Sequence, residues 1–149
     1  MKKIYSLGLM ALLLLLPVGF GSCSDDDEGT GSASMLVGTW ETVYQFLQEK
    51  ENGIVVDEEE NTERVRVTFN EDGTYDSAEY YNGEWDWNFE GTWSYTNGKL
   101  TVIEDGDSFL LTVKTLTASK LVTEETARET YNGNTYEYYA LTEFRKISN

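Results

Sequence analysis

The sequence contains no histidine, one cysteine and one proline, and it has few basic residues. Without histidine the chain lacks the commonest general base and the usual partner of a nucleophilic side chain. Histidine-based zinc sites are excluded for the same reason, and a single cysteine cannot form an intrachain disulfide. Many carboxylates remain, but their spacing selects no acid–base pair over an ordinary solvated surface. We therefore predict a protein that is not an enzyme and holds neither a metal nor a cofactor.

Acidic residues outnumber basic ones by more than two to one in this sequence. Asp and Glu number 27 against 11 Lys and Arg, which gives a net charge of −16. Such a surface repels phosphate backbones and anionic headgroups, so nucleic acid is excluded as a partner. Aromatic residues make up 13% of the chain, and each can bury a large area. A core that needs no disulfide is therefore feasible.

The only long apolar run lies at the N-terminus. Lys2 and Lys3 precede the nearly continuous apolar segment 7–16, and small residues lead up to Ser22. This order is typical of a secretory signal peptide, and the run is shorter than the ~20 residues that a spanning helix needs. We predict a signal peptide over residues 1–22, with a retained anchor helix as the alternative. Its removal would leave 9 Lys and Arg against 27 Asp and Glu, a net charge near −18.

The single cysteine follows this segment directly. The sequence GFGSC, which ends at Cys23, resembles the lipobox of bacterial lipoproteins, although Phe20 stands where that motif usually has leucine. The resemblance implies cleavage before Cys23 and attachment of lipid to its sulfur, and several acyl chains on one residue anchor a protein stably to a membrane. The alternative is a free thiol, which is reactive in an oxidising compartment.

An acidic run comes next. Its sequence, SDDDE, resembles the signal that sends some Gram-negative lipoproteins to the cell surface; its residues are Ser24, Asp25, Asp26, Asp27 and Glu28. The resemblance implies a lipid-anchored protein on the outer face of the outer membrane, and a solvated spacer is the alternative. Residues 29–34, GTGSAS, have the composition of a flexible linker. We predict a tether over residues 23–35 and one folded domain over 36–149.

Turn dipeptides divide the domain into short segments with alternating apolar residues. Asn-Gly and Asp-Gly are the strongest short signals of a β-hairpin, and period-two alternation indicates strands with one wet face. They predict eight antiparallel strands: 36–50, 63–70, 74–81, 84–96, 99–104, 107–116, 119–131 and 134–147. Segment 119–131 can equally be drawn as a helix, and the acidic segment 52–63 is a loop with room for a short strand at 54–56. Such a meander either closes into an up-and-down barrel or stays a curved sheet, and closure removes the exposed edges.

The start of the first strand carries a family resemblance. LVGTW, residues 36–40, resembles the Gly-x-Trp signature of lipocalins and their calycin relatives, and the later segments VTFNEDGTY and GTWSY resemble small lipocalin-like domains of bacterial lipoproteins. The resemblance implies an eight-stranded barrel closed at one end by Gly38 and Trp40, with Arg145 over the indole and Lys146 as the alternative cation. The later Thr-Asp-Tyr motif of lipocalins is missing, and so is a helix after the last strand.

Two functions follow for a barrel of this size, whose interior holds either side chains or one small ligand. In the first, a small apolar or uncharged ligand binds among inward aromatic residues; the candidates are Tyr44, Phe69, Tyr75, Trp85, Trp87, Trp93, Phe109, Tyr136 and Tyr138. In the second, the interior is filled and the domain is a surface interaction module that binds a glycan or a protein. A group of exposed tyrosines, such as Tyr80, Tyr81 and Tyr139, would favour the second.

Overall fold

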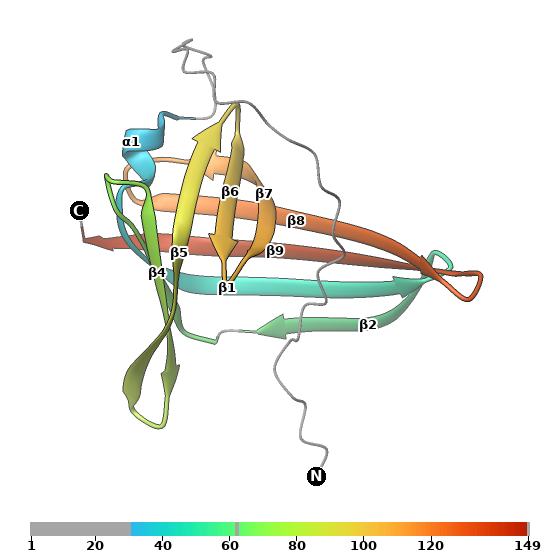
Figure 1. Ribbon diagram of the computed structural model, residues 1–149. Helices are drawn as coiled ribbons and strands as arrows, with labels where there is room; N and C mark the ends of the chain where they lie inside the picture. The colour runs from blue at the N-terminus through green and yellow to red at the C-terminus, as the bar shows by residue number, and fades with distance from the viewer. Residues whose placement is uncertain (1–30, 62, 149) are drawn as a thin grey trace.

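The computed structural model describes residues 31–61 and 63–148, apart from the side chains of Trp87 and Asn88. The predicted signal peptide, Cys23 and the acidic run from Ser24 to Glu28 lie outside these residues. The described part of the chain is almost entirely β-structure (Figure 1). It contains no helix of the length and apolar character that crossing a membrane requires.

One short helix precedes nine strands, and all eight predicted strands are confirmed to within a few residues. The elements are α1 Ala33–Leu36, β1 Gly38–Glu51, β2 Ile54–Asn61, β3 Val65–Phe69, β4 Thr74–Tyr81, β5 Glu84–Thr96, β6 Lys99–Glu104, β7 Asp107–Leu116, β8 Lys120–Tyr131 and β9 Asn134–Ser148. Segment 119–131, for which the sequence left a helix as the alternative, forms strand β8. The acidic segment after β1 is the additional strand β2, which is longer than the short strand expected there.

Five of the six Asn-Gly and Asp-Gly pairs adopt the backbone expected of them, and at the sixth, Asp72-Gly73, only the glycine has positive φ. At Asn52, Asn82, Asn97, Asp105 and Asn132 the backbone φ is positive, and each of these residues precedes a glycine whose φ is also positive. Positive φ at both central residues defines the type I′ turn, whose twist matches that of the flanking strands. These turns lie at the strand boundaries that the sequence predicts.

Pairing of the first and last strands closes the sheet into a barrel. The strand order is β2-β1-β3-β4-β5-β6-β7-β8-β9, and β1 pairs with β9 as well. Residues 38–41 of β1 pair with β3, whereas residues 45–51 pair with β2. The closed ring thus consists of eight antiparallel strands, and β2 lies beside the second half of β1. Figure 1 shows β1, β2, β8 and β9 running beyond the short strands β6 and β7 as an extension of one wall.

Apolar side chains fill the closed end of this barrel. The buried residues there are Leu36, Trp40, Val67, Phe69, Leu100, Val102, Val113, Leu116 and Leu121. Trp40 is fully buried, and its Nε1 donates a hydrogen bond of 2.7 Å to the carbonyl oxygen of Leu36. Helix α1 supplies Leu36 to this core.

The cation that covers Trp40 is Lys146. Its Nζ lies 5.3 Å from the centre of the indole ring and donates a hydrogen bond to the carbonyl oxygen of Met35. Arg145, the first choice from the sequence, forms an ion pair with Glu41 instead. Successive residues of a strand point to opposite faces, so only one of the two neighbours can cover an inward tryptophan. The prediction of Arg145 is corrected to the alternative, Lys146.

Two of the register shifts in the sheet change which of the predicted pocket residues face inward. The register shifts between Thr42 and Tyr44 of β1, and again where Ser77 and Ala78 of β4 pair with Phe89 and Trp87 of β5. A bulge inserts one extra residue and so reverses the alternation beyond it. The inward–outward alternation of side chains across residues 84–96 is therefore interrupted. The inward positions expected from the sequence are correct only on one side of each bulge.

Candidate ligand-binding site

Four of the predicted pocket residues lie together inside the barrel. Phe69 is buried, and its ring centroid lies 5.6 Å from that of Tyr75 and 5.3 Å from that of Trp93. Trp93 Nε1 donates a hydrogen bond of 3.0 Å to the carbonyl oxygen of Asn70, and Phe109 packs against the same core. These side chains form the packed floor of the barrel.

The other candidates lie elsewhere. Tyr44 follows the first bulge and donates a hydrogen bond to Glu60 on the outer face, and the ring of Trp85 lies beneath two outward arginines. Tyr136 and Tyr138 lie on the extension, and the side chain of Trp87 is outside the described part of the chain. The structure thus brings together Phe69, Tyr75, Trp93 and Phe109 and separates the rest from them.

Above this floor, the inner face of the extension carries a row of apolar side chains, here called the apolar wall, beside polar ones such as Gln45 and Glu49. Leu47 of β1 pairs with Ala140 of β9, which pairs with Glu125 of β8. Two residues further out along β9, Tyr138 pairs with Ala127 of β8. These positions share the face that carries the core residue Phe144. Leu47, Tyr138 and Ala140 are only half-buried, since β6 and β7 end before they reach this part of the wall. The interior is therefore filled at its base, whereas the inner side chains at the opposite end of the barrel, here called the open end, are partly exposed.

Half-buried ionisable groups lie along this interior. Burial raises the pKa of Tyr75 to about 12, although a hydrogen bond with Ser77 opposes the shift. Burial also raises the pKa of the Glu125 carboxyl, and burial together with the charge of Asp105 raises that of Glu104. The pKa of Tyr138 is raised by burial and then by the charges of Glu129 and Glu49. The open end thus combines aromatic and aliphatic side chains with carboxyl groups.

Basic residues are segregated from this face. Among the described residues, Lys146 is the only Lys or Arg that shares the inner register, and it lies at the closed end against Trp40. Lys114, Lys120 and Arg128 form ion pairs on the outer face, with Glu124, Glu143 and Glu137. An anionic group that enters the open end would therefore meet carboxylates and no counter-charge. This electrostatic asymmetry favours uncharged ligands over anionic ones.

Two hollows lie on the outside of the barrel. The first, of about 360 Å³, crosses the outer face of the extension and is lined by residues that include Lys50, Arg128 and Tyr139. The second, of about 450 Å³, lies beside α1 and is lined in part by Val37, Glu71 and Lys146. Beside the first hollow, Phe46 and Tyr139 form an edge-to-face pair with centroids 6.1 Å apart. The outer face thus offers aromatic contact surface of its own.

Sequence reasoning missed the β1 side of the wall, because alternation alone does not reveal a bulge. Gln45, Leu47 and Glu49 share an inner face only after the bulge near Thr42, whereas Tyr44 was assigned inward. The apolar alternation of Tyr136, Tyr138 and Ala140 was the signal that pointed correctly to this wall. No three His, Cys, Asp or Glu side chains gather as a metal-binding group within residues 31–61 and 63–148.

Comparisons with known proteins agree with this architecture. The model of the lipocalin-like domain family matches residues 36–123, which is more than half of the chain. Insecticyanin from the tobacco hornworm Manduca sexta has a similar fold, with a TM-score of 0.50, 10% identity and coverage of 82% of this chain and 69% of that one. A lipocalin-like protein from Bacteroides uniformis gives a TM-score of 0.48, with 17% identity and coverage of 76% and 99%. None of the curated proteins matches the sequence.

Proposed function

The chain belongs to the lipocalin-like domain family, and from that premise we propose that it is a non-catalytic binding protein for a small apolar or uncharged ligand. The observation that carries this proposal is the half-buried apolar wall at the open end of the barrel, formed by Leu47, Tyr138 and Ala140 above a packed aromatic floor. A ligand held between the wall and the floor would cover apolar surface that the chain leaves partly exposed.

The chemistry of the wall limits the ligand. Apolar burial contributes roughly 25 cal/mol per Å², so a ligand gains affinity by covering these side chains. Burying a charge without a partner costs several kcal/mol, to an order of magnitude, and the inner face offers no cation away from Trp40 in the described residues. A fatty alcohol or a retinoid-like molecule therefore suits the site better than a fatty acid anion of the same length.

We also propose that the protein works at the cell surface, as a lipoprotein of the outer membrane held by lipid on Cys23. The support is the order of sequence features before residue 31: the basic head, the apolar run, GFGSC and the acidic SDDDE run. The strong negative charge of the domain agrees with this role, because such a domain gains nothing from anionic headgroups and needs a lipid to stay at a membrane.

A titration with matched probes tests the ligand proposal. The chain from residue 23 onward, carrying Cys23→Ser, is titrated with 1-dodecanol, dodecanoate and a retinoid-like probe while its tryptophan fluorescence is recorded. We expect a change with dodecanol and a weaker affinity for dodecanoate. Ala140→Tyr, which narrows the open end, should weaken the binding of dodecanol. Thr126→Tyr, on the outer face of the neighbouring strand, is the control and should leave it unchanged. No response to any apolar probe would exclude the proposal.

The second candidate is a surface interaction module, and the filled closed end together with the Phe46–Tyr139 pair favours it. In that case the partner, a glycan or a protein, would contact the outer face of the extension. Loss of neutral-oligosaccharide binding on Tyr139→Ala, with unchanged binding on Tyr131→Ala at the exposed β8–β9 turn, would support this candidate.

A further inference from the structure

Three arginines surround one buried glutamate on the outside of the barrel. Glu41 is only 3% exposed; its Oε2 accepts a hydrogen bond of 2.8 Å from Arg66 Nε. Its Oε1 accepts hydrogen bonds of 3.3 Å from Arg64 Nη2 and 3.1 Å from Arg145 Nη2. Burial alone raises the pKa of Glu41, but the hydrogen bonds from Arg66 and Arg145 and the charge of Arg64 outweigh it and lower the pKa. Glu41 is thus ionised at neutral pH, and the cluster keeps an excess of two positive charges.

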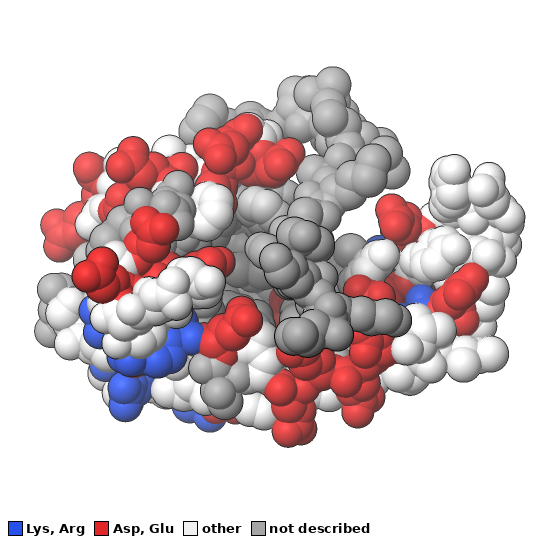
Figure 2. Space-filling model, turned by 90° about the horizontal axis from the view of Figure 1, so that it is seen from below, with Lys and Arg blue, Asp and Glu red and all other residues white. Residues whose placement is uncertain are grey.

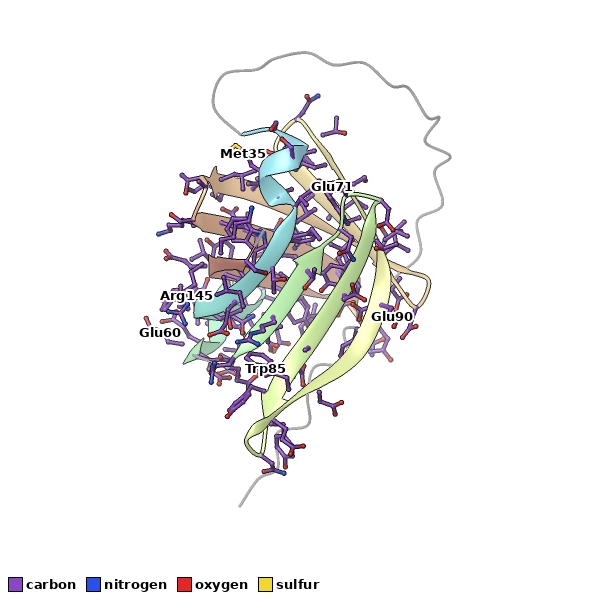
Figure 3. The ribbon with its side chains drawn as sticks, turned by 90° about the vertical axis from the view of Figure 1, so that its left-hand side faces the viewer. Met35, Glu60, Glu71, Trp85, Glu90 and Arg145 are labelled. Carbon is purple, nitrogen blue, oxygen red and sulfur yellow. The ribbon has the colours of Figure 1, made fainter. Side chains whose placement is uncertain are left out.

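The strand register places this cluster on one continuous outer surface. Arg145 of β9 pairs with Glu41 of β1, Glu41 pairs with Arg66 of β3, and Arg66 pairs with Ala78 of β4. Figure 2 shows most of the basic side chains of this view gathered at one end of the molecule, with acidic ones scattered over the rest of it. Figure 3 shows Arg145 and Trp85 on the side that faces the viewer. This surface lies on the opposite face of the sheet from the apolar wall.

Two aromatic rings hold two of the three arginines, Arg64 and Arg66, in place. The guanidinium carbon of Arg64 lies 4.5 Å from the ring centroid of Tyr80 and 5.1 Å from that of Trp85. The guanidinium carbon of Arg66 lies 3.9 Å from the centroid of Trp85. Stacked guanidinium groups have lost much of their conformational freedom before a ligand arrives, so less affinity is lost in ordering them. We call these five residues, Arg64, Arg66, Arg145, Tyr80 and Trp85, the arginine patch.

The patch has more donors than Glu41 uses. Each guanidinium carries five N–H donors, and each of the three arginines gives Glu41 one hydrogen bond. The side chains remain accessible, with 46% of Arg64, 28% of Arg66 and 61% of Arg145 exposed. A second carboxylate can therefore be recognised by preordered donors, and Arg–carboxylate pairs of this kind are among the strongest hydrogen bonds in proteins.

We propose that the arginine patch binds a sugar unit that carries a single carboxylate, of the uronic acid class, within an otherwise neutral glycan. The positive excess is small, and the chain as a whole carries −16, so polyanions such as nucleic acids are repelled by the rest of the surface. The ligand must hold its charge in one compact group. The C–H face of the pyranose ring beside that group can pack on Tyr80, whose side chain is partly exposed next to Arg64.

A matched pair of ligands tests this proposal. Phenyl β-D-glucuronide and phenyl β-D-glucoside differ at the carboxylate, and saturation-transfer NMR measures the dissociation constant of each for the full chain in a polyoxyethylene detergent. A hydrogen bond to a charged group contributes enough to predict at least about tenfold tighter binding of the glucuronide. Equal affinity for the two, or no binding of either, would overturn the proposal. If a peptide with a single glutamate, acetyl-Gly-Glu-Gly-amide, bound as tightly as the glucuronide, the part of the proposal that names a sugar would be wrong.

Two variants with the same change of charge locate the site. Arg145→Gln removes the most exposed arginine of the patch, while Arg64 and Arg66 still neutralise Glu41, and it should weaken glucuronide binding about tenfold. Arg128→Gln, an exposed arginine on the outer face of β8, should leave the affinity unchanged. Far-UV circular dichroism checks that both variants fold. An equal loss in both variants would mean that the ligand responds to overall charge, which refutes binding at the patch.

Discussion

Replacing Trp40 with alanine should destabilise the fold more than any other single change at the closed end. The side chain is fully buried, and truncation of a large buried aromatic costs ~3–5 kcal/mol. The carbonyl of Leu36 would also lose its 2.7 Å partner, and an unsatisfied buried acceptor costs ~1–3 kcal/mol. These contributions share one site and do not add fully, so we expect a loss of about 4 kcal/mol in the free energy of unfolding.

Substitutions of Lys146 and Arg145, the two candidate cations over Trp40, provide a reference for this loss of stability. A cation over an indole contributes ~0.5–2 kcal/mol, depending on its exposure, so Lys146→Met should cost about 1 kcal/mol. Arg145→Ala should cost less, because Glu41 keeps Arg64 and Arg66 as partners. Glu58→Ala, in exposed β2, should change the stability by less than ~0.5 kcal/mol.

The assay is urea unfolding at pH 7, carried out on the chain from residue 23 onward with Cys23→Ser. Unfolding is monitored by far-UV circular dichroism rather than by tryptophan fluorescence, because Trp40→Ala changes the tryptophan content. The expected order of destabilisation is Trp40→Ala, Lys146→Met, Arg145→Ala and Glu58→Ala. A loss below about 1 kcal/mol for Trp40→Ala would show that this indole does not support the closed end. A larger effect of Arg145→Ala than of Lys146→Met would refute the assignment of Lys146 as the covering cation.

Three further outcomes are expected. Cys23→Ser should move the protein from the membrane fraction to the soluble fraction of cells, and full membrane retention without processing would exclude lipidation at Cys23. Replacing Asp25, Asp26 and Asp27 with alanine should preserve lipidation but reduce digestion by protease added to whole cells; unchanged digestion would identify the run as a spacer. The Glu41 carboxylate should stabilise the fold above the ordinary pKa of 4.5 and lose this contribution as the pH falls through its lowered folded value. The stability difference between the parent and Glu41→Gln should therefore shrink between pH 6 and pH 3, and a constant difference would contradict the ionised pairing.

Local signals in the sequence predicted most of the backbone. Asn-Gly and Asp-Gly pairs adopt positive φ because of their own chemistry, and alternation of apolar residues reflects the strand period, so neither needs a distant contact. The eight strands and their order around the ring follow from these signals. The Gly-x-Trp resemblance added the closed end, where Gly38 has a φ of 120° that other residues rarely adopt and Trp40 is fully buried.

Only the tertiary structure decided which side chains meet. A bulge depends on how neighbouring strands fit together, so the sequence did not reveal that Tyr44 and Trp85 face outward while Leu47 lies on the wall. The choice between Arg145 and Lys146 over Trp40 depends on the register of β9 against β1, which the barrel sets when it closes. The arginine patch has the same origin, since Glu41, Arg66 and Arg145 come together only when β1 pairs with β3 on one edge and with β9 on the other. Residues far apart along the chain share no local signal, and only the pairing of their strands in the barrel brings them side by side.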